Sequence, residues 1–139
     1  MNNENYPTWL VPINIAKELK EIGFDEPCNH YVRISNDDIK LKINHSSIGL
    51  VILKRNSEYL NDDIASFVTI PTWTDVFAWF RAKGYYGNLE ASSKGSSAYI
   101  YAPFLDQGTS WDIAYKESYE EAREALLLKL IDLYKAAKQ

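Results

Sequence analysis

The residues best suited to covalent chemistry are one cysteine and two histidines, Cys28, His30 and His45. A thiolate nucleophile needs a base within hydrogen-bond reach, and usually a third group that orients the base. Nothing in the sequence shows that these side chains converge, and the local motifs typical of cysteine proteases are absent. We therefore interpret Cys28 as a partly buried residue in a loop, and we expect no catalytic residues.

Metal and acid–base chemistry have weaker candidates. A structural zinc needs four ligands, usually Cys and His residues paired at short spacing, and this chain has too few. The pairs Asp37–Asp38 and Asp62–Asp63 fall in predicted turns, so we interpret them as solvated turn residues and expect no metal or cofactor. Glu90 and Asp112 are the candidates for an acid–base pair, if neighbouring strands bring them together.

A predicted hairpin over residues 31–44 carries a possible nucleic-acid site. Apolar residues alternate with Arg33, Lys40 and Lys42, so these cations are expected on the solvent face. Tyr31 shares that face, and a basic face that bears an aromatic ring is typical of several single-strand binders. The formal net charge of −4 argues against general binding to phosphate backbones.

The aromatic residues form the main site hypothesis. Aromatics make up 14% of the chain, and tyrosine suits half-buried surfaces because its ring is apolar and its hydroxyl is polar. The set expected on one face of the later strands comprises Tyr99, Tyr101, Trp111 and Tyr115, with Tyr85 or Tyr86. If a helix covers that face it is core, and otherwise it is a surface for a partner or a sugar. Ile113 alternates onto the same side as Trp111, which favours burial.

Three helices are predicted, over residues 12–22, 73–83 and 119–137. The second and third begin with capping boxes, in which Thr72 and Ser118 precede Asp75 and Glu121 by three residues. Gly23 is expected to end the first helix in a left-handed conformation.

Strands are predicted between these helices, at 31–35, 39–44, 48–53, 64–70, 85–91, 98–102 and 111–115. The run 48–53 is apolar on both faces, so we expect it at the centre of a sheet. The fold class is α+β: antiparallel strands in one sheet or two, with three helices packed on them, in the order α-βββ(β)-α-βββ-α. A constant offset relates Ile15, Leu19 and Gly23 to Val76, Phe80 and Gly84, and shared helix patterning explains it as well as a duplication does.

Length and composition indicate a single domain of 139 residues in which 1–8 form a loose lead. A lone cysteine excludes an internal disulfide. The first residues lack the basic and apolar regions of a secretion signal, so we expect a cytoplasmic protein. The longest strongly apolar run, 48–53, is too short to cross a bilayer, and we expect no membrane partner.

Three stretches together resemble a group of small uncharacterised proteins from gut Bacteroidales and their phages and mobile elements. They are Trp9–Cys28, Pro71–Gly84 and Tyr119–Ala125, which cover both ends and the middle of the chain. The resemblance implies a cytoplasmic setting and an accessory, mobile-element-related role. It transfers no activity or ligand.

We therefore expect a non-enzymatic accessory or regulatory protein that binds another protein through its aromatic surface. The alternatives are a nucleic-acid-binding module that uses the basic hairpin, a small enzyme, and a binder of carbohydrate or another small ligand. The sequence leaves the oligomeric state open.

Overall fold

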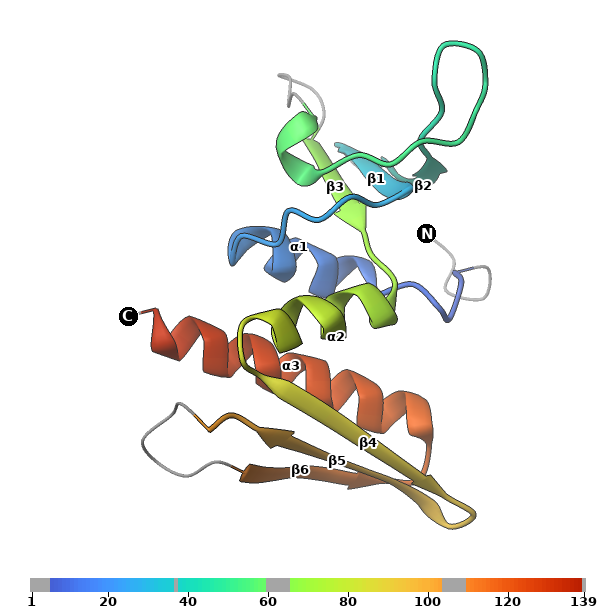
Figure 1. Ribbon diagram of the computed structural model, residues 1–139. Helices are drawn as coiled ribbons and strands as arrows, with labels where there is room; N and C mark the ends of the chain where they lie inside the picture. Colours follow the sequence, from blue (N-terminus) through green and yellow to red (C-terminus); the bar gives the residue numbers. More distant parts are fainter. Residues whose placement is uncertain (1–5, 37, 60–65, 104–109, 139) are drawn as a thin grey trace. The chain divides into compact units, whose positions relative to one another are not determined.

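The computed structural model describes residues 6–36, 38–59, 66–103 and 110–138, and for 110–115 it describes the backbone alone. Within these ranges it has three α-helices, a short 3-10 helix and six strands, which form two separate antiparallel sheets (Figure 1). The predicted α+β class and element order are confirmed. Contacts divide the chain into two compact units, Met1–Trp73 and Thr74–Gln139. The prediction of a single domain stays a prediction.

The first unit begins with α1 (Ile13–Glu21), whose apolar stripe Ile15, Ala16 and Leu19 is buried. Gly23 ends the helix as predicted, at φ +96°, a left-handed conformation that glycine adopts without steric cost. Phe24 then turns back, and its N–H donates to the Leu19 carbonyl. The helix is thereby closed at its C-terminus by backbone bonds.

The first sheet has the order β2-β1-β3, formed by β2 (Asp38–Ile43), β1 (His30–Ser35) and β3 (Ser66–Ile70). Val32 at its centre lies opposite Leu41 on one side and Val68 on the other, so these residues share a face. Val32 and Val68 are buried, and α1 packs against β3. The alternate residues therefore form the other face of this sheet.

The predicted central strand at 48–53 is wrong. This run turns back on residues 44–46 as a small hairpin: Ser46 N–H donates to Leu50 O, and Ile52 N–H donates to Asn44 O. Strand β1 already has β2 on one side and β3 on the other, so no central position is left for another strand. A continuous apolar run is compatible with a central strand but does not require one.

Polar contacts hold the segment that follows the hairpin. Asn56, at the start of η2 (Asn56–Glu58), is buried; its amide nitrogen donates to Phe24 O, and its amide oxygen accepts from Thr69 N–H. The Asp25 carboxylate accepts from both the N–H and the hydroxyl of Ser57. These bonds fix the chain beside β3 and bring Tyr59 next to the sheet.

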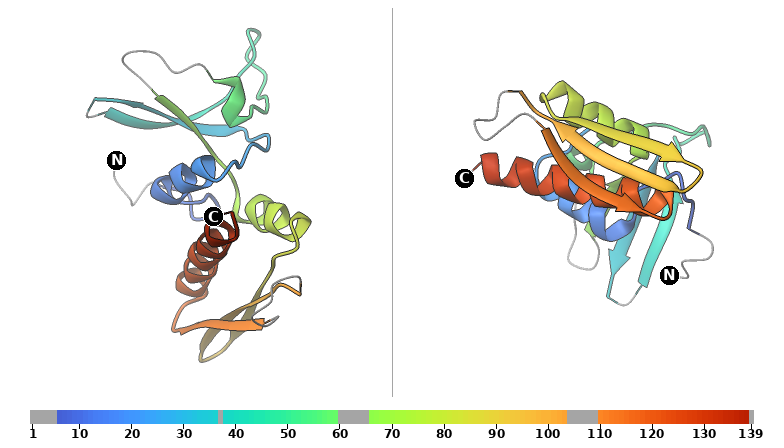
Figure 2. Two further views of the ribbon diagram at one scale, coloured as in Figure 1. Left: turned by 90° about the vertical axis from the view of Figure 1, so that its left-hand side faces the viewer. Right: turned by 90° about the horizontal axis from the view of Figure 1, so that it is seen from below.

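The second unit contains the meander β4 (Tyr86–Ser92), β5 (Gly95–Tyr101) and β6 (Ser110–Lys116), followed by α3 (Tyr119–Ala137). Helix α3 packs across all three strands (Figure 2). Ser118 Oγ accepts from Glu121 N–H, so the predicted cap at this helix is confirmed. At Gly87 an added Cβ would lie 3.2 Å from side-chain carbons of both Leu126 and Leu130, so glycine permits the close approach of helix and strand.

Aromatic side chains pack between α2 (Trp73–Ala82) and α3. Trp79 and Phe80 contact Tyr134, with ring centroids 5.2 Å and 6.2 Å away, and Tyr85 also contacts Phe80. Trp79 is buried here, although the periodicity placed it on the flank of the apolar stripe. Tyr85 is buried as well, so it belongs to the core and not to the predicted surface.

The strand orders bear on the suggested duplication. The first strand after α1 is the central one of its sheet, whereas the second strand after α2 is the central one of its sheet. Duplicated units keep their strand order, so shared helix patterning explains the offset between the two helices better.

Candidate functional site

The four residues predicted for nucleic-acid binding lie on one face of the first sheet. The register pairs Tyr31 with Lys42 and Arg33 with Lys40, and directly opposite residues share a face. Lys40 and Lys42 are exposed, and Tyr31 and Arg33 are half-buried. The alternation read from the sequence is thereby confirmed in its geometry.

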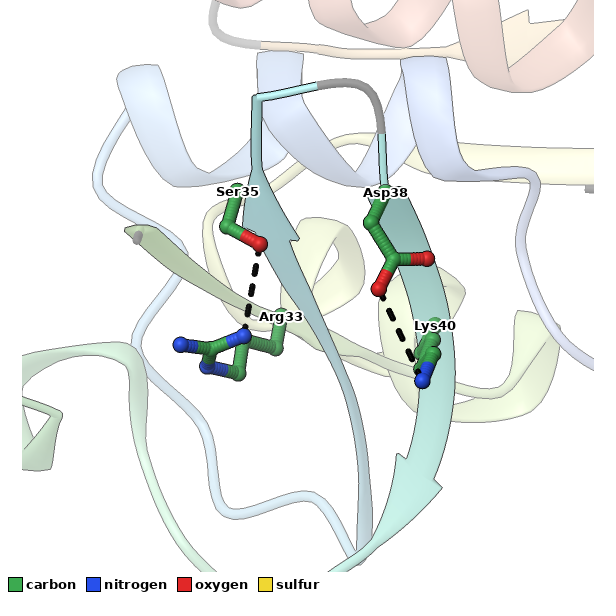
Figure 3. Close-up of polar contacts among 4 residues, drawn as sticks. All are labelled: Arg33, Ser35, Asp38 and Lys40. Atoms are coloured by element: carbon green, nitrogen blue, oxygen red, sulfur yellow. Dashed lines mark hydrogen bonds and ion pairs between the residues drawn. The ribbon is translucent and has the colours of Figure 1, made fainter. Parts of the chain in front are cut away.

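Two short contacts hold these cations along their own strands (Figure 3). Lys40 Nζ lies 3.6 Å from an Asp38 carboxylate oxygen, and Arg33 donates to Ser35 Oγ at 3.3 Å. Both members of the Lys40–Asp38 pair are more than half exposed, so water and salt screen it. The pair therefore leaves Lys40 accessible to another anion.

An aromatic cluster extends this face toward β3. Tyr59 stacks on Phe67 with ring centroids 5.5 Å apart, and Tyr31 lies 5.2 Å from Tyr59 and 6.1 Å from Phe67. Phe67 is the register partner of Arg33, so it belongs to the same face. We define the open face as Tyr31, Arg33, Lys40, Lys42, Tyr59 and Phe67. Tyr59 lies inside the stretch 55–63, whose sequence predicts a polar loop. Nothing in the sequence shows that β3 pairs with β1 and so brings Phe67 onto this face.

A pocket of about 410 Å³ opens beside this cluster. Its lining includes all three aromatic residues together with Asn44, His45, Lys54 and Glu58. Lys54 Nζ lies 4.7 Å from the centroid of the Tyr59 ring, and the Tyr59 hydroxyl donates to Asn44 Oδ1 at 2.5 Å. Burial raises the pKa of Tyr59 to about 12, so the phenol is neutral at pH 7. The pocket thus combines flat apolar rings with an ammonium group and an amide.

A second depression of about 650 Å³ also has Tyr31 in its lining. His30, Lys42 and His45 contribute to its lining. Tyr31 and His45 line both depressions, so they separate two adjacent recesses on the first unit.

The predicted aromatic surface of the second unit is only partly described. Tyr86, Tyr99 and Tyr101 are 37–45% exposed, and the rings of Tyr86 and Tyr101 lie 6.0 Å apart as a cross-strand pair. We call these three residues the tyrosine face. The side chains of Trp111 and Tyr115 lie outside the described residues; their backbone partners are Ile100 and Ser97.

The thiol and histidines do not form a site with a cysteine nucleophile in the described part of the chain. Cys28 is buried, its Sγ lies 3.5 Å from Glu26 O, and it lines neither recess. His30 Nδ1 lies 2.6 Å from Asn29 Oδ1, and burial lowers the pKa of His30. His45 is exposed on the hairpin. The lining of the larger recess brings the two histidines near each other, without the thiol.

The carboxylate candidates remain apart in register. Glu90 on β4 pairs with Ser97 on β5, and Ser97 pairs in turn with Tyr115 on β6. Asp112, which is also on β6, pairs instead with Tyr99, so β5 lies between the two carboxylates. Asp37, Asp62 and Asp63 lie outside the described residues. Among the residues that are described, no three His, Cys, Asp or Glu side chains gather closely enough to hold a metal ion.

No known protein family, no curated protein and no solved structure matches this chain. The resemblance to Bacteroidales proteins stays a prediction. No helix in the described ranges is long and apolar enough to cross a membrane.

Proposed function

We propose that this protein binds single-stranded nucleic acid on the open face of its first unit. The observation that carries the proposal is the register, which gathers Arg33, Lys40 and Lys42 on the face where Tyr31 meets two further aromatic rings. Unpaired bases stack on aromatic rings without regard to sequence, while cations beside them bind the phosphates.

The local charge of this region supports the proposal despite the net charge of −4. From Ile39 to Ser57 the chain carries Lys40, Lys42, Lys54 and Arg55 and no acidic residue. The negative charge of the protein is therefore carried by other segments. Coulomb attraction is screened over about 10 Å at 0.1 M salt, so a ligand on this face responds mainly to the nearby charges, which are these four cations together with Asp38 and Glu58.

The test is fluorescence anisotropy with a labelled oligonucleotide of about 12 thymidines. Lys40→Glu with Lys42→Glu is expected to weaken binding at least tenfold, because two attractive charges become repulsive. Lys17→Glu with Lys116→Glu makes the same change in net charge at two exposed lysines that are not part of the open face, and is expected to leave binding within twofold. Equal weakening by both pairs would mean that overall charge, and not this face, controls binding.

Two further measurements separate stacking from charge. Replacing Tyr59 by Ala is expected to cost about 1–3 kcal/mol of binding, as loss of one stacking platform does. Three phosphate contacts give a slope of about −2 in a plot of log affinity against log salt. An affinity that changes neither with salt concentration nor with the Tyr59 substitution would contradict the proposal.

A second candidate function is binding of another protein through the tyrosine face. It is favoured by the exposure of Tyr86, Tyr99 and Tyr101 on one sheet, because exposed aromatic residues are typical anchors of interfaces. Pull-downs with and without nuclease, using the wild-type chain and a variant with all three replaced by serine, test it. A protein that survives nuclease and is lost in the triple variant supports this function. For either activity, the resemblance supports an accessory role in the cytoplasm.

A further inference from the structure

The hairpin after β2 is the most exposed apolar element that the structure describes. Among the described large hydrophobic residues, the four highest exposures all lie on it: Ile48 79%, Leu50 62%, Leu53 61% and Val51 56%. In Figure 1 this segment extends away from the sheet of its own unit. Exposed apolar residues concentrated in one short segment mark a site of contact, whereas scattered ones need no explanation.

Backbone hydrogen bonds hold the hairpin in a defined conformation. Its strands pair at His45 and Val51, and Gly49 N–H donates to Ser46 O, with Gly49 in a left-handed conformation at φ +85°. At its base, Lys54 and Cys28 exchange two backbone hydrogen bonds of 2.8 Å. The apolar side chains are therefore held on a backbone that is fixed at both the turn and the base.

The second arm of the hairpin is apolar on both of its sides, whereas the first arm, residues 44–47, is polar. Side chains alternate along a strand, so Val51 and Leu53 point to one side while Leu50 and Ile52 point to the other. Ile48 lies at the turn between them. The boundary of a lipid layer offers acyl chains to apolar side chains and headgroups to polar ones, so it suits a hairpin with one apolar and one polar arm.

Basic residues surround the base of the hairpin. Lys40 and Lys42 precede it, Lys54 and Arg55 follow it, and no acidic residue lies between Ile39 and Ser57. The rest of the chain carries eleven basic and nineteen acidic residues. Each cation near an anionic lipid surface contributes roughly 1 kcal/mol of attraction.

We propose that this hairpin inserts its apolar tip into the surface of an anionic membrane while the basic residues at its base contact the lipid headgroups. Ile48 and Ile52 are four positions apart, so the tip reaches at most roughly 13 Å beyond Ile52 at about 3.3 Å per residue. Amphipathic segments bury their apolar side about 5–10 Å into the boundary of headgroups and acyl chains. The hairpin is long enough for that depth and does not span the bilayer, so the sequence argument against a spanning segment does not apply to it.

The experiment is co-sedimentation of the full chain with vesicles of phosphatidylcholine alone, or with about 30% phosphatidylserine. The wild-type chain is expected to bind the anionic vesicles at least tenfold more tightly than the neutral ones. Replacing Ile48, Leu50, Val51 and Leu53 by serine is expected to reduce binding at least tenfold. Leu128→Ser, which removes an exposed leucine from α3, is the matched control and is expected to change nothing.

A fluorescent label at the tip separates insertion from charge attraction alone. Ser47→Cys in a Cys28→Ser background, labelled with an environment-sensitive dye, is expected to shift its emission to the blue on anionic vesicles. The same label at Ser93→Cys, in the turn between β4 and β5, is expected to show no shift. Absence of vesicle binding, or binding that keeps its strength without the apolar tip, overturns the proposal.

Two other occupants would be recognised by different results. If the hairpin is covered by a second copy, light scattering gives a dimer that the serine variant dissociates, with no vesicle binding by the wild-type chain. If the cations near the hairpin bind only nucleic acid, the variant with serine at the four apolar positions binds the oligonucleotide as the wild-type chain does, and the wild-type chain does not bind vesicles. Either result overturns the membrane proposal, and neither depends on whether the open face binds nucleic acid.

Discussion

The two units of this protein contain the same kinds of secondary-structure element, but the exposed surfaces of their sheets carry different side chains. Each has a three-stranded antiparallel sheet against which a helix packs, α1 in the first and α3 in the second. The open face of the first sheet carries Arg33, Lys40 and Lys42 beside stacked aromatic rings. In the second sheet the tyrosine face is exposed, and Glu90 lies on the same side of β4 as Tyr86. One architecture thus presents a cationic surface in one unit and, in the other, an aromatic surface that bears a carboxylate.

The units also differ in how their segments are held. In the second, a meander with a short β4–β5 turn lies under a 19-residue helix, and the helix contributes six buried residues to the core. In the first, a long connection between β2 and β3 is held by side-chain bonds, chiefly those of Asn56. The stability that α3 provides is shared among many buried apolar residues, whereas the connection in the first unit depends mainly on the hydrogen bonds of one side chain, Asn56.

The largest effect is expected at Leu130, which is fully buried in α3. Leu130→Ala is expected to lower the free energy of unfolding by about 3 kcal/mol, through lost burial and the cavity left behind. Leu128→Ala on the same helix removes a residue that is 39% exposed and is expected to change stability by less than about 0.5 kcal/mol. Urea denaturation followed by circular dichroism measures both. Similar losses at the two positions would contradict the packing of α3 described above.

The next effect is expected at Asn56. Asn56→Ala leaves the Phe24 carbonyl and the Thr69 N–H without this partner in a buried region, at an expected cost of about 2 kcal/mol. Asn88→Ala removes an exposed side-chain bond to Tyr86 O and is expected to cost about 0.5 kcal/mol or less. The same denaturation assay compares them. A cost at Asn56 no larger than at Asn88 would show that the connection is held in another way.

A smaller and opposite effect is expected at Thr69. Its side chain is buried, and within the described residues Oγ1 has no hydrogen-bond partner. Thr69→Val replaces the hydroxyl by a methyl group of similar size and is expected to stabilise the protein by about 1 kcal/mol. Thr69→Ser keeps the hydroxyl and removes the methyl group, so it is expected to destabilise. If valine destabilises instead, the hydroxyl has a partner in solution.

The last effect appears only at alkaline pH. Burial raises the pKa of Tyr59 from 10.0 to about 12, so between these values the unfolded chain loses a proton that the folded chain retains. The stability that Tyr59 contributes is therefore fully present below pH 10 and declines as the pH rises toward 12. Absorbance at the phenolate band, compared between wild type and Tyr59→Phe, measures this titration. A difference spectrum that titrates near pH 10 would show that Tyr59 is solvated, and that the aromatic cluster on the open face is loose.

Individual elements show which features of the fold can be predicted from local sequence. The helix over residues 119–137 was predicted with the bounds that α3 has, because a Ser cap and an apolar stripe are encoded within the helix itself. The face that bears Arg33, Lys40 and Lys42 was also predicted, since strand alternation depends only on neighbouring residues. The run 48–53 was placed wrongly because its pattern was compatible with a buried strand, and burial depends on which strands already occupy the sheet.

Local sequence encodes the helices, the Ser118 cap of α3, the Gly23 ending of α1 and the polar side of β1 and β2, because short-range bonds and the backbone repeat control these features. Tertiary structure decided which distant segments meet. It brought Tyr59 and Phe67 beside Tyr31, buried Trp79 and Tyr85 against Tyr134, and left the apolar hairpin outside the sheet. The physical reason is that strand pairing and burial are set by the arrangement of the whole unit, and residues far apart in the chain carry no local sign of that arrangement.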